Sequence, residues 1–428
     1  MVAILGALAF GTACALVDVL ARHGLYGAVA DALFVTPFWS DAVKVVGGAV
    51  PYRDFPLEYP PLGLPVFVLP AILPFGGTTL ESYRTAFEVV VAGVGMAVVP
   101  VVVATVARLG GRRPDVLAAA GIVAVSPLLL GPLSISRYDL WPAVLTAGAV
   151  AALLWDRHRL GHALLGLGIL AKVYPAFLVP IFAAWTWRRA GPRTTLAGLG
   201  VLLAVVAAGI LPFAAVAPDG ALAPFSRSVA RPLQIESLGA AVLIALHDLV
   251  GLDVGRTTYE FESYNLAGPL PSLVATAQTL ALGATLLGIW IGAARRPLSP
   301  ERFVVACAAA IAAAVAFGKV LSPQYVLWLL PAVVVLGPPM RGAGRRLALL
   351  VAILALTAMY YPAAYGPYVA RFDQSATVII LARNLAIVAV AADTAIAAGA
   401  LWWVSRWLPG PRPPRRPGPP AGRAPAGA

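Results

Sequence analysis

Long apolar segments follow one another along the whole chain and are separated by short polar stretches. A segment of roughly 17–25 apolar residues is long enough to cross the hydrocarbon core of a membrane as a helix. The segments lack the alternation of polar and apolar residues that the strands of a membrane barrel would need. The pattern predicts an all-α polytopic membrane protein with twelve crossings, at about residues 1–20, 85–107, 116–133, 138–155, 160–171, 174–187, 195–215, 272–294, 302–318, 323–338, 346–362 and 377–403.

Two further apolar segments, at about 62–75 and 237–250, are shorter than the others. A full crossing by 62–75 would place the arginine-rich loop at about 108–113 outside the cell. That placement would oppose the bias of basic residues towards the cytoplasm. We therefore expect both segments to be re-entrant or interfacial.

Charged residues make up only 12% of the chain, although its formal net charge is +12. A soluble protein would carry about twice that fraction. The arginines form short clusters that flank the apolar segments, as in cytoplasmic loops, and this placement argues against a nucleic-acid partner. Twelve crossings put both termini in the cytoplasm. We expect a transmembrane domain over residues 1–407 and a disordered Pro- and Arg-rich cytoplasmic tail over 408–428.

This topology gathers the polar motifs on the outer side of the membrane. Two large outer loops, at about 21–61 and 216–271, carry PYRDFPLEYPPL and RPLQIES. Outer turns carry SRYDLWP, AKVYP and GKVLSPQY. Most aspartates and glutamates map to the same side. Motifs from distant parts of the chain are thus predicted to line a single outward cavity.

Lysine is rare in this chain and restricted to the outer side. Lys and Arg together number 31, and the only lysines are Lys44, Lys172 and Lys319. Lys172 and Lys319 occupy matching positions at the outer turns of two short helical hairpins. A compact ammonium group there suits an anionic ligand. The alternative is a lysine that extends its charge to the membrane interface.

An outward cavity lined by carboxylates and cations suits a lipid-linked sugar phosphate. The lipid tail stays in the bilayer, and the phosphate needs Lys or Arg at the membrane boundary. Transfer of the sugar to an acceptor hydroxyl needs a carboxylate base. The sequence has no P-loop and no His or Cys spacing typical of a metal site. We therefore expect neither a nucleotide cofactor nor a metal.

Several of these motifs resemble glycosyltransferase family 87 of the GT-C superfamily. They are PYRDFPLEYPP after Asp41, RYDLWPA, AKVYPAFLVP and KVLSPQYVLWLLP, and the resemblance covers about residues 35–335. It implies a GT-C-like bundle in the plasma membrane with a large first outer loop. It also implies an inverting transferase that moves mannose from a polyprenyl phosphate to a glycolipid or glycan acceptor on the outer face. Glucose or arabinose transfer by a related enzyme stays open.

The resemblance assigns a general base to the first outer loop. Asp41 best matches the catalytic aspartate of the family. The family often has a tyrosine four residues later, where this chain has Val45. Asp54 and Glu58 are therefore retained as alternative bases.

The remaining candidates are assigned to substrate binding. Lys172 and Lys319 are expected to hold the lipid phosphate, supported by Arg137 and Arg231 and held in turn by Asp139 and Glu236. The rim of the first loop and the sugar contacts are expected to come from Tyr52, Arg53, Tyr59, Tyr174, Gln324 and Tyr325. Tyr174 and Tyr325 fit an aromatic interface belt equally well. The first loop is alternatively a structural element clamped by an ion pair of Arg53 with Asp54 or with Glu58.

Two other classes of function remain open on the sequence. A transporter or lipid flippase would place charges near the membrane midplane. The deep candidates for such charges are Asp18, Glu88, Arg383 and Asp393. The polar residues instead concentrate at one face, which favours the transferase. A non-enzymatic assembly or anchoring protein is the third possibility.

Overall fold

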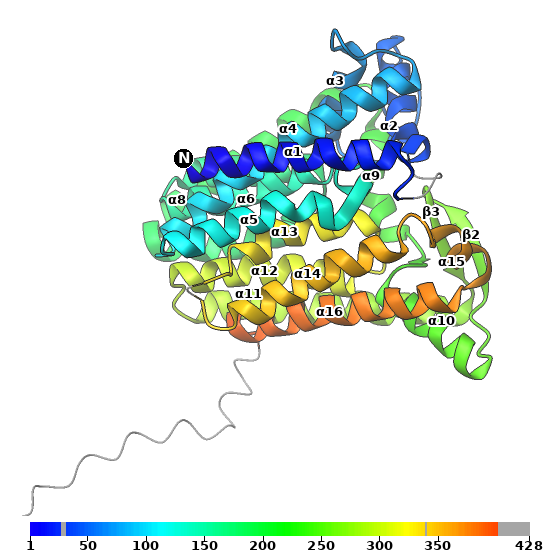
Figure 1. Cartoon of the computed structure of the whole chain (residues 1–428). Coiled ribbons are helices and arrows are strands. Elements are labelled where there is room, and N and C mark those ends of the chain that lie inside the picture. Colours follow the sequence, from blue (N-terminus) through cyan, green and yellow to red (C-terminus); the bar gives the residue numbers. More distant parts are fainter. Residues whose placement is uncertain (27–30, 339, 401–428) are drawn as a thin grey trace, which may run out of the picture.

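The computed structural model describes residues 1–26, 31–338 and 340–400, without the side chains of 31–34, 228 and 229. Most of these residues are helical, and the long helices run side by side in one bundle (Figure 1). Within the described residues, eight helical segments are long and apolar enough to cross a membrane. The prediction of an all-α polytopic membrane protein is confirmed. The predicted tail, 408–428, lies outside the described residues.

The long helices coincide with predicted crossings. They are α1 (Val2–Arg22), α4 (Leu80–Arg108), α5 (Arg113–Leu130), α8 (Val179–Ala214), α11 (Pro269–Arg295), α12 (Pro300–Phe317), α14 (Ala343–Tyr360) and α16 (Gln374–Ala398). Helix α8 contains a break at Gly191, whose φ of 79° and ψ of 176° are not helical. The break separates α8 into two parts, which correspond to the predicted crossings at 174–187 and 195–215.

Shorter helices occupy the other predicted crossings. They are α6 (Leu140–Leu154), α7 (His158–Ala171) and α13 (Val326–Val334). A 3-10 turn precedes α13 at Pro323–Tyr325, another precedes α8 at Tyr174–Leu178, and a third lies at Gly131–Ser134 between α5 and α6. Every predicted crossing therefore has a helical counterpart, and the count of twelve crossings stays a prediction.

The two short apolar segments also form helices. Segment 62–75 contains a 3-10 turn (Pro61–Gly63) followed by α3 (Leu64–Ile72), and 237–250 contains α10 (Leu238–Val250). Figure 1 places both at the right-hand end of the bundle. The first residues of α1 and the last residues of α16 lie towards the opposite end (Figure 1).

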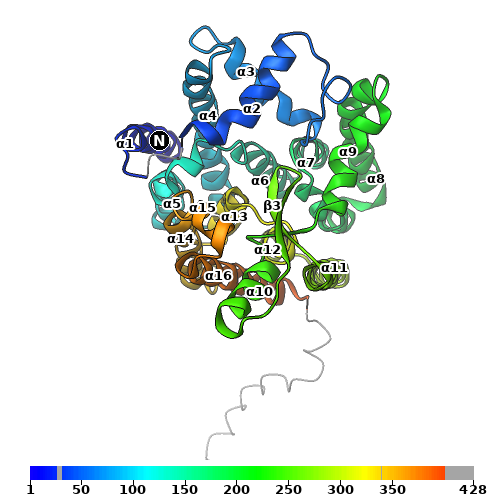
Figure 2. The ribbon, with the colours of Figure 1, turned by 90° about the vertical axis from the view of Figure 1, so that its right-hand side faces the viewer.

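The large loops at about 21–61 and 216–271 contain regular secondary structure. The first contains α2 (Asp31–Val46), and the second contains α9 (Pro218–Ala230), α10 and a small antiparallel sheet with the strand order β1-β3-β2. Its strands are β1 (Leu233–Gln234), β2 (Arg256–Glu260) and β3 (Ser263–Ala267). Helix α15 (Tyr365–Arg371) lies at the same end. Figure 2, seen from this end, shows α2 and α3 at one side, α9 beside α8, and β3 nearer the middle.

Side-chain caps determine where several helices begin. An oxygen of the capping residue accepts a hydrogen bond from a backbone N–H of the first turn, which would otherwise lack a partner. The caps are Thr79 for α4, Ser237 for α10, Ser299 for α12 and Asp373 for α16.

Helix α12 forms the centre of the packed bundle. Every residue from Phe303 to Ala316 is buried, and most are alanine. Small side chains let neighbouring helices approach closely, which is how helices associate in a membrane. The second part of α8 has the opposite character, because its leucines 196, 203 and 211 are exposed. We infer that these leucines face lipid.

Candidate active site

Side chains from the five motifs that were predicted to face outward meet at the end of the bundle that carries the sheet, with Tyr325 representing the fifth motif beside Lys172. Arg231 donates to Glu58 at 2.9 Å, and Lys172 donates to Asp139 at 2.6 Å. Trp328, three residues after Tyr325, also donates to Asp139 at 2.8 Å. These bonds join residues that are 173, 33 and 189 positions apart in the chain. The predicted convergence of distant motifs therefore holds for these residues.

Helix α2 presents Asp41 from the first outer loop. One turn before it, Phe38 packs against Phe67 and Phe87 with ring centroids 4.7 and 5.3 Å apart, which fixes this face of α2 against α3 and α4. The Asp41 side chain is only 16% exposed and receives a hydrogen bond from Lys44 at 3.3 Å. Burial raises the pKa of Asp41 to about 6, although Lys44 lowers it.

Glu58 belongs to the proline-rich part of the loop and lies within electrostatic range of Asp41. Arg231 bridges Glu58 to the carbonyl oxygen of Phe261, so it ties the first outer loop to the turn between β2 and β3. Burial raises the pKa of Glu58, and the charge of Arg231 opposes that shift. The ion pair also means that Glu58 does not pair with Arg53, which was one of the two clamps expected for this loop.

Glu262 at the tip of the β2–β3 hairpin completes a group of three carboxylates. Its negative charge raises the pKa of both Asp41 and Glu58, so the three acids lie near one another. Phe261 and Glu262 both have positive φ, 53° and 50°. They are the two central residues of the tight hairpin turn, and positive φ at both positions matches the twist of the flanking strands. The sequence reasoning did not single out Glu262.

Lys172 sits among aromatic rings beside this group. Its ammonium lies 4.8 Å from the ring centre of Tyr325, 5.0 Å from Tyr138, 5.1 Å from Trp328 and 6.0 Å from Tyr59. The side chain is 12% exposed, and its partner Asp139 is 1% exposed. The expected role of Asp139, holding a candidate phosphate-binding lysine, therefore has a direct structural basis.

One oxygen of the Asp139 carboxylate accepts no hydrogen bond from the described residues. Its Oδ1 receives the bonds from Lys172 and Trp328, whereas its buried Oδ2 has no hydrogen-bond partner among the described residues. A buried polar atom is normally satisfied, so this oxygen marks a place for a further donor.

Arg137 provides a second cation in the same region. It donates to the Tyr361 hydroxyl at 3.2 Å, and its guanidinium lies 5.9 Å from the ring centre of Phe38. Burial lowers the pKa of Lys172, Asp139 raises it, and the positive charges of Arg137 and Arg231 lower it again. The three cations therefore lie within electrostatic reach of one another.

A family-level comparison agrees with this geometry. The model of glycosyltransferase family 87 matches residues 57–323, well over half of the chain. The chain belongs to glycosyltransferase family 87. Among curated proteins, none matches the chain at a significant level. The protein is thus a membrane glycosyltransferase. The matched range includes Glu58, Asp139, Lys172 and Arg231, and Asp41 precedes it.

In this family 87 member, the other candidates of the first loop form contacts within that loop. Asp54 is exposed and pairs with Arg53 at 2.8 Å, and it also accepts from the backbone N–H of Val50 at 2.7 Å. The Arg53 side chain lowers the pKa of Asp54 to about 2. Tyr52 donates to the carbonyl of Tyr59 at 2.6 Å. These contacts shape the first loop and match the expected Arg53–Asp54 clamp.

Glu236 belongs to a fully buried polar network and lies within electrostatic range of Arg137. Its carboxylate bonds to Tyr360, and Gln234 donates to it at 3.2 Å. Its carbonyl accepts from Arg383 at 3.0 Å. Gln234 in turn bonds through its backbone N–H to the carbonyl of Lys319 at 2.9 Å. The network thus fixes β1 against the loop that carries Lys319.

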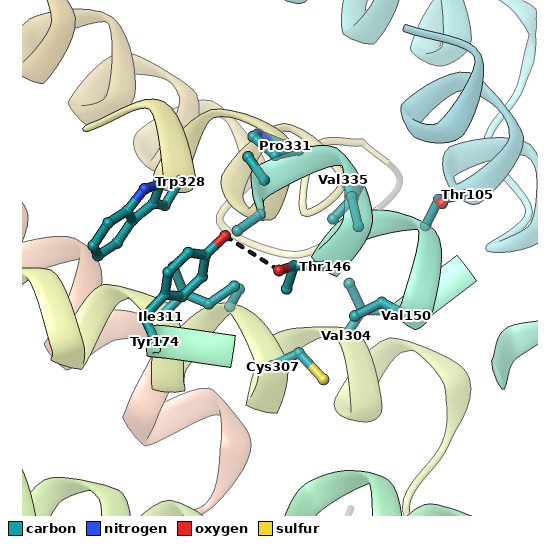
Figure 3. A pocket seen from close by; sticks show the side chains of 14 residues that line it. Thr105, Thr146, Val150, Tyr174, Val304, Cys307, Ile311, Trp328, Pro331 and Val335 are labelled. Atoms are coloured by element: carbon teal, nitrogen blue, oxygen red, sulfur yellow. Dashed lines mark hydrogen bonds between the residues drawn. The ribbon is translucent and has the colours of Figure 1, made fainter. Parts of the chain in front are cut away.

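Tyr174 and Tyr325 flank Trp328 in a continuous stack, with centroid distances of 4.1 and 4.0 Å. Gln324 is half-buried in the adjoining 3-10 turn. Behind the stack, an apolar cavity of about 30 Å3 lies between α4, α6, α12 and α13. Figure 3 shows the Tyr174 hydroxyl bonded to Thr146 at the edge of this cavity, 3.2 Å apart. That volume accommodates about one water molecule.

Several further residues of the candidate site were not indicated by the sequence. Tyr138, Trp328 and Tyr361 surround the cations, and Glu262 joins the acids. Tyr138 and Trp328 belong to motifs that were recognised, but aromatic residues at span ends are common and carry no specific signal. Among the described residues, no group of three or more His, Cys, Asp or Glu side chains is arranged to hold a metal ion.

Proposed function

We propose that the protein transfers a sugar, mannose by family resemblance, from a polyprenyl phosphate to a hydroxyl of a glycolipid or glycan acceptor. The reaction takes place at the outer face of the plasma membrane and requires neither a metal nor a nucleotide. The observation that carries this proposal is the arrangement at the sheet-bearing end. Asp41 and Glu262 lie within electrostatic range of Glu58, which pairs with Arg231. Arg231 and Arg137 in turn lie within electrostatic range of Lys172.

Asp41 is the proposed general base. A base works best when its pKa lies near the operating pH, and burial brings the pKa of Asp41 to about 6. Asp41 takes the proton of the acceptor hydroxyl while the hydroxyl oxygen attacks the anomeric carbon of the donor. Glu58 is less suited to this step because its carboxylate is engaged by Arg231.

The leaving group is the polyprenyl phosphate. As the bond between the anomeric carbon and the phosphate oxygen breaks, the electron pair stays on that oxygen. Lys172 and Lys319, supported by Arg137 and Arg231, stabilise this negative charge, because charge-assisted hydrogen bonds to phosphate are strong. Attack opposite the leaving group inverts the anomeric configuration.

The charged residues that a transporter would use near the membrane midplane give this alternative less support than the transferase has. Asp18 pairs with Arg22 at 2.8 Å, and Asp393 pairs with Arg346 at 2.5 Å. Arg383 is held by the carbonyl of Glu236. Glu88 pairs with Arg84 at 2.8 Å. Within the described part of the chain, each of the four deep candidates thus has a partner in the helix bundle, which favours structural roles.

The test is transfer by the purified protein in lipid nanodiscs. We expect label from decaprenyl-phosphate mannose to appear in a lipid or glycan acceptor from cell envelopes. Asp41→Asn removes the base and should lower turnover by at least about 100-fold. The control Asp253→Asn changes an exposed aspartate of the second outer loop and should leave turnover unchanged. Full activity in both Asp41→Asn and Glu58→Gln would refute a base in the first loop.

The sugar and the acceptor require a separate experiment. Deletion of the gene should remove one sugar residue from a specific class of envelope glycolipid or glycan, detected by mass spectrometry. Complementation with the wild-type gene, but not with Asp41→Asn, should restore it. Unchanged envelope composition would favour the assembly or anchoring alternative.

A further inference from the structure

A polar cavity lies between the first outer loop and helix α9. Its volume is about 280 Å3, and Tyr52–Leu57 line one wall. Gly220, Ala223 and Arg227 of α9 line the other. A Cβ atom on Gly220 would approach the carbonyl oxygen of Tyr52 to 2.2 Å, so glycine lets α9 close directly against the loop. The volume corresponds to several water molecules and is large enough for a small polar group.

Arg227 is a half-buried cation without a committed partner. Among the described residues, its side chain forms no hydrogen bond or ion pair, whereas the neighbouring arginines Arg53 and Arg231 are paired with Asp54 and Glu58. A guanidinium carries five N–H donors and is costly to bury without acceptors. The side chain therefore has donors to offer inside the cavity.

The charges of the lining residues favour an anion. Arg53 and Asp54 compensate each other through their ion pair, and Arg227 leaves a positive excess. The planar fork of an arginine matches the oxygens of phosphate and carboxylate groups. A neutral sugar would leave the charge of Arg227 uncompensated.

The cavity adjoins the carboxylates of the proposed active site. The charge of Arg227 lowers the pKa of Glu58, which directly follows the lining residue Leu57. Exposed apolar residues lie along the same part of the chain, namely Leu211 in the last turn of α8, Val216 after it and Leu222 on α9. Such residues place α9 at the level of the lipid headgroups.

We propose that this cavity is an anion subsite in which Arg227 binds the phosphate group of a ligand. The subsite is separate from Lys172 and Arg137, which the proposed function assigns to the donor phosphate. The ligand is either the headgroup of an anionic phospholipid or free phosphate. The exposed leucines favour the headgroup.

Binding can be measured without turnover, on the full chain in dodecyl maltoside micelles. Native mass spectrometry should detect retained phosphatidylglycerol in preference to phosphatidylcholine. Arg227→Ala should lower the apparent affinity for phosphatidylglycerol by about tenfold or more, because it removes charge-assisted hydrogen bonds. The control Arg256→Ala removes an exposed arginine of β2, which does not line the cavity, and should have no effect.

A second variant tests the contribution of the cavity to binding independently of the charge of Arg227. Ala223→Leu should fill the cavity while retaining Arg227, and it should also weaken retention. Thermal unfolding verifies that each variant is folded. Displacement of the lipid by millimolar inorganic phosphate would assign the site to phosphate itself, and lack of displacement would assign it to the lipid headgroup.

Three results would overturn the anion subsite. They are equal retention by folded Arg227→Ala and Arg256→Ala, unchanged retention in folded Ala223→Leu, and the absence of any preference for phosphatidylglycerol or phosphate in the wild type. Anion binding should persist in Asp41→Asn, so a failure of the transfer reaction and a failure of this subsite are distinguishable.

Discussion

At the scale of residues, the candidate site depends on how burial and ion pairing change the pKa of chemically identical carboxyl groups. Asp54 is exposed and paired with Arg53, and the pKa of its carboxyl falls to about 2. Asp41 lies 13 positions earlier on α2, is mostly buried, and has a pKa raised to about 6. Two aspartates of one loop are thus tuned in opposite directions, and only the second is suited to take up a proton near neutral pH.

The raised pKa of Asp41 predicts the acid limb of the pH profile. A base is active when deprotonated, so the rate of transfer should fall as the pH drops through about 6. Lys44 lowers this pKa and Glu262 raises it. Lys44→Ala should therefore move the limb to higher pH, and Glu262→Gln should move it to lower pH. The measurement is kcat/KM against pH, with Asp253→Asn as control. An acid limb that stays in place in both variants would contradict Asp41 as the titrating base.

At the scale of elements, turns and helix breaks determine which side chains reach the candidate site and where the helices end. The β2–β3 turn carries Glu262 to the acids, and α2 holds Asp41 through the packing of Phe38. The break in α8 at Gly191 turns one long apolar stretch into two parts. Only glycine adopts a φ of 79° without steric cost, so this residue determines where the first part ends.

The break in α8 can be tested with two glycines of the same helix. Gly191→Ala forces a side chain into the left-handed region and should destabilise the protein by about 1 kcal/mol. Gly200 lies in the regular part of α8 with open space around its Cα. Gly200→Ala should be stabilising by about 0.5–1 kcal/mol. Thermal unfolding in micelles measures both. A stabilising Gly191→Ala would show that the break does not need the positive φ.

At the scale of the whole molecule, the bundle has two chemically different ends. The sheet and α2, the helix that contains Asp41, lie at one end, and the start of α1 and the end of α16 lie towards the other (Figure 1). The buried alanine-rich α12 joins the two ends through the centre. This asymmetry suits an enzyme that works at one membrane face better than a carrier that opens to both.

The orientation of the bundle can be tested by cysteine labelling. The two native cysteines, Cys14 and Cys307, are buried and should not react with a membrane-impermeant maleimide. Asp253→Cys, at the sheet-bearing end, should be labelled in intact cells. Glu301→Cys, at the start of α12, should be labelled only after permeabilisation. The reverse pattern would place the proposed active site in the cytoplasm.

The sequence by itself determined that this chain is a helical membrane protein, because hydrophobicity acts locally and each apolar segment must satisfy its own backbone in lipid. It also identified the five motifs that meet, and the Arg53–Asp54 pair, whose partners are adjacent. Only the tertiary structure decided that Glu58 pairs with Arg231, which of the expected cations Asp139 holds, and that Glu236 belongs to a buried network. It also revealed Glu262 and Arg227. Such pairings depend on how helices and loops from distant parts of the chain pack against one another, and no local sequence pattern specifies that packing.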